Sequence, residues 1–239
     1  MTLRGNIFGG SGIFRSAIFG GAGGAPVVPW YLSGGIAAAN CIAAYTPKGA
    51  ASLAASYDNN AAPANGLPDG TYDAAPGVAP TWNVVTGWTY AGGQYLTTGI
   101  VPAGTHTTIV RFANCITSGG YLFGSFLVAG TVIYGVCPFY TGVGPGVQYW
   151  NQPSVPAAIL PNMSDGVLAI AGAAGFRGGA PDAVLGGTGN TGLAMFIGAL
   201  NMGGVAAVQL VGDILAVAHY DITITDAQVL AVSTAAAAL

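Results

Sequence analysis

Residues 212–229 read Gly-Asp-Ile-Leu-Ala-Val-Ala-His-Tyr-Asp-Ile-Thr-Ile-Thr-Asp-Ala-Gln-Val, and the two halves of this stretch follow different patterns. The first half, 213–220, is an apolar run of strand length between turn residues, which is typical of a β-strand. In the second half, Thr225 lies three residues before Gln228, the spacing of a helix-starting capping box. The apolar face of that helix would come from Val229, Leu230 and Val232. The stretch therefore predicts a strand that leads into a short C-terminal helix.

The chain upstream of this stretch alternates short apolar runs with turn residues. Turn signals recur at intervals of about ten residues, which is the spacing found in β-sandwiches and barrels. Residues 88–96 predict a hairpin about Gly92 and Gly93, and residues 58–80 read as a loop that contains four prolines. The further strands predicted are 40–45, 107–113, 121–126, 132–136, 146–150, 167–171 and 193–197. We therefore expect an all-β domain.

The charge content is the most unusual property of the composition. Among 239 residues only 5% are charged, Glu is absent and Lys48 is the single lysine, whereas 52% are hydrophobic and 40 are glycine. Disordered chains are charged and poor in apolar residues, so this composition argues for a folded protein. A free monomer usually relies on a mixed, charged surface. We therefore expect copies of this chain or other proteins to cover much of its surface; the alternative is a monomer whose outside is built from Ser, Thr, Asn and Gln.

Two classes of partner are disfavoured by the same composition. The net charge is −3, and the five cations are Arg4, Arg15, Lys48, Arg111 and Arg177. They are too few for a basic patch, so nucleic-acid binding is not expected. Residues 194–211 carry no charge, but a membrane-spanning helix needs about 20 mostly apolar residues. Because this segment contains Asn201, Gln209 and several glycines, we expect strand, loop and strand, and no membrane span.

The three cysteines, Cys41, Cys115 and Cys137, are widely spaced along the chain. An odd number at these spacings matches neither a zinc site nor a dense disulfide framework. One disulfide with a free thiol is one interpretation, and three buried apolar cysteines is the other. The second is favoured, since free cysteine is among the most buried residue types.

The N-terminal segment, residues 1–29, differs from the rest of the chain. It is rich in glycine, is interrupted by Arg15 in a way that does not suit a secretion signal, and ends with Pro26 and Pro29. Its apolar side chains form three pairs: Ile7 and Phe8, Ile13 and Phe14, Ile18 and Phe19. Burying one such side chain fully stabilises an interface by roughly 1.5–3 kcal/mol before ordering costs. We interpret 1–29 as an assembly arm that docks into a neighbouring subunit and 30–239 as the main domain; the alternative is an extra pair of strands packed on its own domain.

The C-terminal stretch resembles the closing strand and tail of concanavalin A-like and laminin-G-like domains. The matching residues are Gly212, Ile214, Val217, Tyr220, Thr225, Asp226, Gln228 and Val229. Residues 88–96 (WTYAGGQYL) resemble an early strand of the same family, and residues 41–57 resemble its opening strand and following loop. The resemblance covers roughly residues 30–235 and implies a lectin-like β-sandwich jelly roll, with the arm before it and the short helix after it.

A narrower resemblance is to virion proteins of tailed bacteriophages, which place a lectin-like jelly roll after a short attachment arm. It implies a non-enzymatic structural protein of the virion, either a head decoration or capsid-associated component or part of a tail or fibre. The implied partners are copies of itself, with a trimer as the analogous oligomer, and other virion proteins. The alternatives are a carbohydrate-binding adhesion module, which would recognise a host-surface glycan, and a subunit of an extracellular or cell-surface filament.

Sugar binding would use exposed aromatic rings with neighbouring amides. The cluster Tyr149, Trp150, Asn151 and Gln152 offers both at the end of a predicted strand. The alternative interpretation is that these large aromatic residues bury area in a core or an interface.

Catalytic and metal chemistry have weaker signals. Glycoside hydrolysis relies on a pair of carboxylates, and with Glu absent only an Asp pair remains, so we expect no enzyme. His219 and Asp221 are two apart on one strand and share a face, but a structural histidine is the favoured interpretation for both His219 and His106. No cofactor is expected, although calcium would suit oxygen ligands from Asp58, Asn59 and Asn60, or from Asp69 and Asp73.

Overall fold

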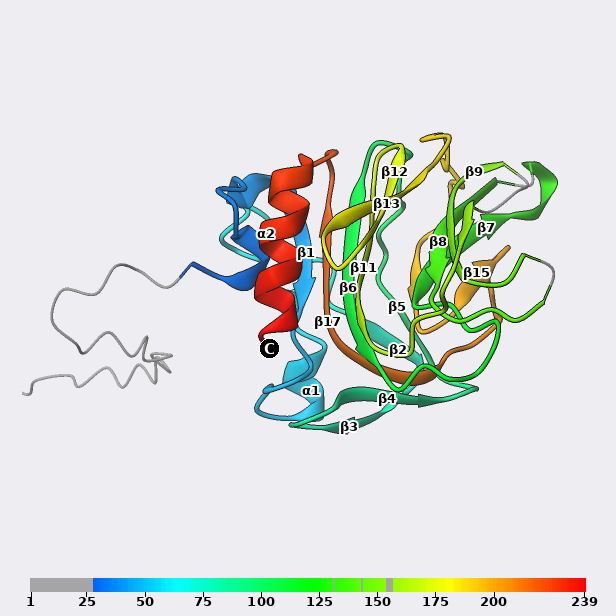
Figure 1. The fold of residues 1–239 in the computed structure, drawn as a ribbon. Coiled ribbons are helices and arrows are strands. Elements are labelled where there is room, and N and C mark those ends of the chain that lie inside the picture. The colour runs from blue at the N-terminus through cyan, green and yellow to red at the C-terminus, as the bar shows by residue number, and fades with distance from the viewer. Residues whose placement is uncertain (1–27, 131, 143, 154–156) are drawn as a thin grey trace, which may run out of the picture.

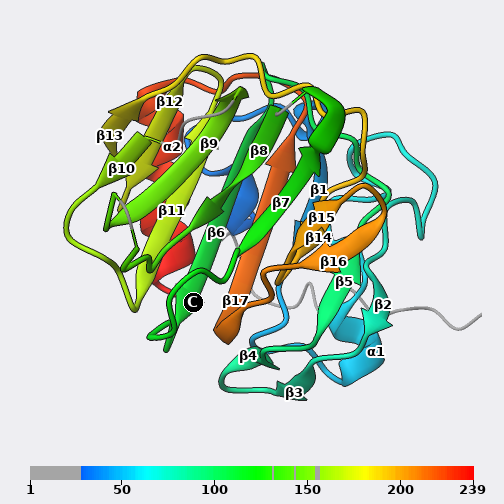
Figure 2. The ribbon, with the colours of Figure 1, turned by 90° about the vertical axis from the view of Figure 1, so that its right-hand side faces the viewer.

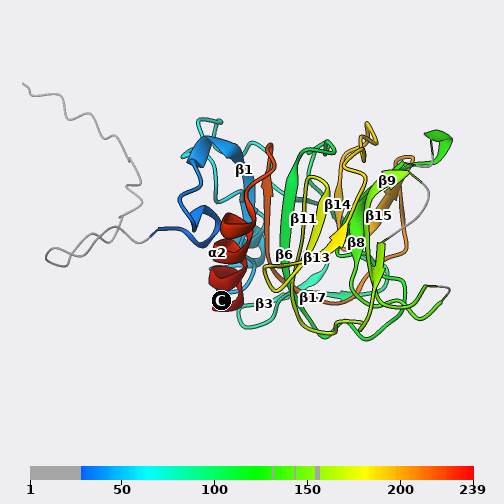
Figure 3. The same cartoon turned by 45° about the horizontal axis from the view of Figure 1, so that its top comes forward.

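Two β-sheets face each other and a helix covers the outside of one of them. The computed structural model describes residues 28–130, 132–142, 144–153 and 157–239. Figure 3 shows the order of the layers: the C-terminal helix α2 (Asp226–Ala237), then a sheet that contains β6, β11 and β17, then a sheet that contains β8, β9 and β15. The β-sandwich expected from the sequence is therefore confirmed.

The first sheet is built around the long strand β17 (Val211–Tyr220). Its order is β13-β12-β11-β6-β17-β4-β3, and β1 also pairs with β17. The start of β17 pairs with β4 and its end with β1, so both share one edge of β17. The other bounds are β1 (Cys41–Tyr45), β3 (Thr81–Asn83), β4 (Gly87–Ala91), β6 (Thr107–Ala113), β11 (Gly166–Ala171), β12 (Ala174–Arg177) and β13 (Ala180–Val184).

The second sheet has the order β10-β9-β8-β7-β14-β5-β2, with β15 and β16 attached beside β7. Its pairs are antiparallel except for β15 with β7, which is parallel. Figure 2 looks onto this sheet from outside. The bounds are β2 (Ala75–Val78), β5 (Tyr95–Thr97), β7 (Phe123–Leu127), β8 (Val132–Cys137), β9 (Val147–Pro153), β10 (Ala157–Ile159), β14 (Phe196–Ile197), β15 (Leu200–Met202) and β16 (Val205–Ala207).

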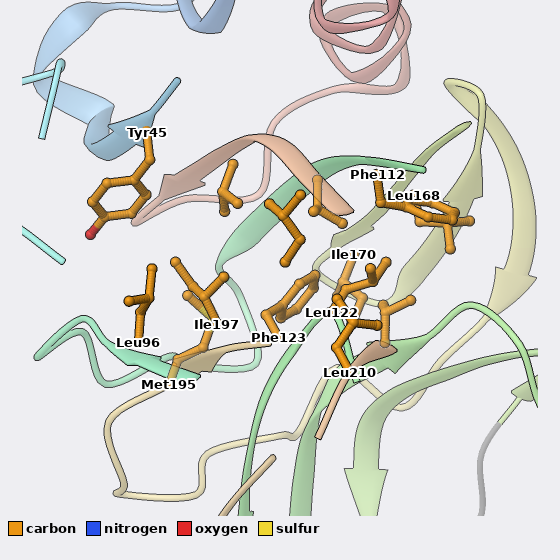
Figure 4. Packing of buried hydrophobic residues seen from close by; sticks show 14 of the residues in the cluster. Tyr45, Leu96, Phe112, Leu122, Phe123, Leu168, Ile170, Met195, Ile197 and Leu210 are labelled. Carbon is orange, nitrogen blue, oxygen red and sulfur yellow. The ribbon is translucent and has the colours of Figure 1, made fainter. Parts of the chain in front are cut away.

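The main core lies between the two sheets, because alternate side chains of each strand point inward. Tyr45, Phe112 and Leu168 reach it from the first sheet, and Phe123 and Ile197 meet them from the second (Figure 4). Each of these five side chains is fully buried. The connections carry the short helices η1 (Trp30–Leu32), η2 (Ala38–Asn40), α1 (Leu53–Ser56) and η3 (Val128–Gly130).

Helix α2 forms a second core on the outer face of the first sheet (Figure 1). The predicted capping box is present: the Thr225 hydroxyl accepts from the backbone N–H of Gln228, whose side chain accepts from the backbone N–H of Thr225. Val229 and Val232 are buried as expected. Leu230 is 51% exposed, so its predicted place in the apolar face is wrong. It lies one residue off the buried stripe, over Gly179.

The hairpin predicted at 88–96 is also wrong. Strand β4 belongs to the first sheet and pairs with β3 and β17, whereas β5 belongs to the second and pairs with β2 and β14. Gly92, with a φ of +93°, allows the chain to turn from one sheet to the other. The two glycines therefore mark a crossing between sheets.

The described cysteines and helices settle two further expectations. Cys41, Cys115 and Cys137 are free and buried, which confirms the favoured interpretation. Burial raises the pKa of the Cys41 and Cys115 thiols to about 12 and that of Cys137 to about 11. Within the described ranges, no helix is both long and apolar enough to cross a membrane. Residues 194–211 contain β14, β15 and β16.

Candidate functional site

The alternation of β9 divides the predicted sugar-binding cluster between two environments. Tyr149 and Asn151 are fully buried on the inner side of the second sheet. Trp150 and Gln152 are partly exposed, and Trp150 packs with the cluster on the outer face. Because neighbouring residues of a strand point to opposite faces, the four side chains do not form one surface.

Tyr149 links the second sheet to the edge of the first. Its hydroxyl lies 2.9 Å from Oδ2 of Asp182 and 3.0 Å from the carbonyl oxygen of Phe176. Arg177 Nε donates to the same Asp182 oxygen over 3.0 Å. Burial, followed by the nearby Asp182 carboxylate, raises the pKa of Tyr149. This phenol is therefore a protonated structural donor.

Asn151 holds three rim loops together. Its amide nitrogen donates to the carbonyl oxygens of Gly104 and Gly172, at 2.8 and 2.6 Å, and its oxygen accepts from the N–H of Gly189 at 2.8 Å. All three partners are backbone groups that would otherwise be buried without a bond. Asn151 is thus a structural residue at the rim of the sandwich.

The outer face of the second sheet carries a patch of aromatic and apolar side chains. We call it the outer patch: Tyr121, Phe126, Ile133, Cys137, Tyr140, Trp150, Leu200 and Met202. Phe126, Tyr140 and Trp150 are its partly exposed aromatic rings. The indole N–H of Trp150 is buried and has no hydrogen-bond partner in the part of the chain that the structure describes. The sequence prediction included Trp150 but missed Phe126 and Tyr140, which lie on other segments.

The suggested calcium ligands gather at one end of the sandwich. Asp58, Asn59, Asn60, Asp69 and Asp73 line a cavity of about 310 Å³. Asn59 is already committed to the fold: its oxygen accepts from the N–H groups of Ala44 and Ala61, and its own N–H donates to Asp73. An adjoining cavity of about 260 Å³ includes Lys48. The described residues hold no cluster of three or more His, Cys or Asp side chains arranged for a metal.

Three other aspartates make specific contacts elsewhere. Asp165 pairs with Arg111 at 3.1 Å, and Asp182 pairs with Arg177 at 3.0 Å. Asp213, which is buried, accepts from the side chains of Thr89 and Asn114. These contacts give each of the three carboxylates a structural role.

The two histidines meet each other across 113 residues of sequence. Nδ1 of His106 lies 3.1 Å from Nε2 of His219, and Nδ1 of His219 lies 2.7 Å from Oγ1 of Thr108. Both ring nitrogens of His219 therefore face these two residues, and the pairing with Asp221 suggested by strand alternation is not formed. No local sequence signal marks the contact, because His106 comes before β6 and His219 lies on β17.

The assembly-arm residues Ile7, Phe8, Ile13, Phe14, Ile18 and Phe19 lie outside the described residues. The first described residue, Val28, is 60% exposed and leads into η1, which packs against α2. The chain therefore enters the sandwich on the side of the helix, opposite the outer patch (Figure 1).

No protein-family model and no curated relative matches this chain. Solved structures do share its fold. Domain 4 of AbnA, a GH43 extracellular arabinanase from Geobacillus stearothermophilus, in complex with arabinotriose, has a TM-score of 0.52 at 14% identity over 81% of this chain and 98% of that one. A Trypanosoma rangeli sialidase in complex with 2,3-difluorosialic acid has a TM-score of 0.50 at 14% identity, over 81% of this chain.

These likenesses establish the β-sandwich and nothing finer. This chain spans only 32% of the sialidase chain and 26% of a chain of NanB, another of the similar structures. At 14% identity the shared fold does not carry a function, since one fold hosts many. The class that fold and site define is thus a β-sandwich domain with an apolar outer patch.

Proposed function

We propose that this chain is a non-enzymatic structural protein of a tailed-bacteriophage virion, attached through its N-terminal arm. The observation that carries the proposal is a surface that is poor in charge and above all in cations. Among the described residues the cationic side chains are Lys48, Arg111 and Arg177, and both arginines are taken up in ion pairs with Asp165 and Asp182. Such a surface suits a protein that neighbours cover.

Exposed apolar side chains support the same conclusion. The large ones are Val28, Leu53, Val78, Val84, Val85, Val101, Ile116, Val128, Leu160, Val184, Val205, Val208, Ile222 and Leu230. Several lie on or beside edge strands, including Val78 on β2 and Val184 on β13. Unpaired strand edges with apolar side chains are surfaces on which another chain can pair.

The positions of the arm and the outer patch favour attachment by one side. The described chain begins at Val28 and leads into η1, which packs against α2. Docking through the segment before Val28 would therefore hold the helical side against the assembly. The outer patch would then face away from it. This arrangement suits a head decoration, or a tail or fibre component, whose partners are further copies of itself and other virion proteins.

The test is deletion of residues 2–24 from the full-length chain. We expect the truncated protein to keep its β-sandwich, measured by circular dichroism, because the described core lies in residues 30–239. Light scattering at several concentrations should show a defined oligomer for the full chain and a smaller species for the truncated one. Incorporation of both forms into particles is the decisive measurement, and normal incorporation of the truncated form would overturn the proposal.

A second candidate, a carbohydrate-binding adhesion module, is favoured by one specific observation. Trp150, Phe126 and Tyr140 present partly exposed rings on a single face. Aromatic rings of this kind bind the apolar faces of sugars, and the arabinanase domain that shares the fold is in complex with arabinotriose. A glycan array with wild type and Trp150→Ala tests it: binding lost in the variant supports a host-glycan role, and no binding by the wild type rejects it.

A subunit of an extracellular filament would share the low charge and the exposed apolar edges. Electron microscopy of the purified full chain separates the two assemblies. Closed rings or small oligomers favour the virion component, whereas open fibres favour the filament.

A further inference from the structure

Four side chains form a continuous hydrogen-bonded chain from the rim of the sandwich into its core. His106 contacts His219, His219 contacts Thr108, and Thr108 Oγ1 lies 2.9 Å from the hydroxyl of Tyr134. Thr108 and His219 are paired residues of β6 and β17 in the first sheet. Tyr134 lies on β8 in the second sheet. We call this series the relay; it joins the two sheets by polar contacts.

Burial distinguishes the outer end of the relay from the rest. His219, Thr108 and Tyr134 are completely buried, with 0% of each residue's surface accessible to solvent. His106, in contrast, is partly exposed. His106 is therefore the member that a proton from solvent reaches first. Burial, with a smaller effect of His106, lowers the pKa of His219 to about 3, and burial also lowers the pKa of His106.

With both rings neutral, counting donors fixes the direction of the hydrogen bonds. The Tyr134 hydroxyl has Thr108 as its hydrogen-bond partner in the described part of the chain, so its proton must point to Thr108 to be satisfied. Thr108 then donates to Nδ1 of His219, and Nε2–H of His219 donates to Nδ1 of His106. In this direction every buried donor of the relay has an acceptor.

A proton on His106 requires the opposite direction. Both ring nitrogens of an imidazolium are donors, so Nδ1–H of His106 must donate to Nε2 of His219. The His219 proton must then sit on Nδ1 and point to Thr108, and Thr108 must donate to Tyr134. The Tyr134 hydroxyl proton is left buried between the sheets without an acceptor, which is costly. The net change is the uptake of one proton and one positive charge.

We propose that the relay is a pH-responsive latch between the two sheets, in which protonation of His106 reverses the tautomer of His219 and unpairs the Tyr134 hydroxyl. This change would act first on the hydrogen bonds of the rim around His106. The His106 carbonyl accepts from the N–H of Gly172, and the neighbouring Thr107 hydroxyl donates to the carbonyl of Ile222, which leads to α2. Acidification would therefore loosen the rim that Asn151 also holds.

The titratable groups that act on the two rings are few. Asp221, which directly follows β17, favours the charged form of His106, and His106 disfavours the charged form of His219. Tyr134 faces the relay from β8, and its burial raises its pKa, so it stays protonated. Asp221 therefore favours opening of the latch, against the larger effect of burial on the pKa of His106.

Imidazole nitrogen spectra of the full-length protein test the latch directly, because the chain has only two histidines. Long-range ¹H–¹⁵N correlation spectra should be recorded from about pH 8 to about pH 4, across the range where histidine titrates. We expect His219 to carry its proton on Nε2 at high pH and to move it to Nδ1, without becoming charged, at the midpoint where His106 titrates. A His219 tautomer that stays the same through the titration of His106 would overturn the proposal.

Two variants isolate the roles. His106→Gln keeps an acceptor for His219 but takes up no proton, so the ring signals of Tyr134, which should follow the His106 midpoint in wild type, should no longer change over that range. Asp221→Asn should lower the His106 midpoint and shift the His219 tautomer change with it. If the two midpoints separate in Asp221→Asn, the groups are not coupled and the latch is rejected.

Discussion

The indole N–H of Trp88 donates to the hydroxyl of Ser56 across 2.8 Å, and both residues are almost completely buried. The bond joins helix α1 to strand β4, and Ser56 in turn donates to the carbonyl of Leu53 over 2.6 Å. Trp88 lies in the main core between Tyr45 and Tyr57. One small hydroxyl thus satisfies the polar atom of the largest buried side chain.

Ser56→Ala should lower the free energy of unfolding by about 1–3 kcal/mol, because it leaves the Trp88 N–H buried without a partner. Urea denaturation followed by tryptophan fluorescence measures the loss. In a Trp88→Phe background, where no N–H needs a partner, the same substitution should cost clearly less. Equal costs in the two backgrounds would show that the bond does not couple the residues.

Asn151→Asp should destabilise the domain near neutral pH, since a carboxylate oxygen would face the carbonyl oxygens of Gly104 and Gly172. The expected loss is about 2–4 kcal/mol, and it should shrink on acidification as the carboxyl becomes protonated. Gln152→Glu is the matched control on the same strand, because its side chain keeps an oxygen for the Gly186 N–H and is partly exposed. Denaturation midpoints for both variants at two pH values check this, and a control as unstable as Asn151→Asp would contradict it.

The buried histidine predicts a defined pH dependence of stability. Because the pKa of folded His219 is lowered to about 3 from 6.5, the stabilisation by the neutral ring is fully present above about pH 6.5. It is lost as the pH falls from there toward the folded value. The unfolding free energy of wild type should therefore approach that of His219→Gln on acidification, by at most about 1.4 kcal/mol per pH unit. Parallel pH profiles for the two proteins would contradict the prediction.

Local sequence patterns predicted the parts of the fold that depend on residues close together in the sequence. The strand at 213–220 and the capping box of Thr225 and Gln228 were found because each is encoded within a few positions. The turn at Gly92 was located but misassigned, because a glycine pair does not encode which sheet the next strand joins. Strands β2 and β13 were missed, since each contains a proline and no alternating pattern.

The candidate sites show the same limit. A period of two places Trp150 and Gln152 opposite Tyr149 and Asn151, so sequence alone could have divided that cluster. The contact between His106 and His219 could not have been found this way, because it depends on the register of β6 against β17. The outer patch likewise combines Phe126, Tyr140 and Trp150 from three segments of the chain.

Gly198 should tolerate a side chain far less well than Gly203. Both have positive φ, +78° and +64°, so either Gly→Ala change carries a backbone cost of roughly 1–2 kcal/mol. A Cβ at Gly198 would lie 2.1 Å from Cε1 of the buried Tyr90 ring, whereas nothing lies within 4 Å at Gly203. Gly198→Ala should therefore lose about 1–3 kcal/mol more than Gly203→Ala in urea denaturation. Similar losses would mean that Tyr90 moves aside at little cost.

The exposed edge of β13 is a candidate contact between copies of this chain. Val184 is 89% exposed at the end of this edge strand, and residues 181–184 line a shallow cavity of about 270 Å³. Val184→Lys adds charge where a neighbouring copy would pair with the edge, so it should reduce the mass of the full-length protein in light scattering. Its unfolding free energy should change by less than about 0.5 kcal/mol, as is usual for a surface position.

The matched control for the edge is Val101→Lys. Val101 is also exposed, at 49%, but lies outside the strands. If only Val184→Lys reduces the mass, the β13 edge is a contact between copies. If both variants reduce the mass equally, added charge weakens association in general and the interface lies elsewhere. A full-sized oligomer in both variants would remove β13 from the assembly while leaving arm docking as a separate question, because the deletion of residues 2–24 tests that independently.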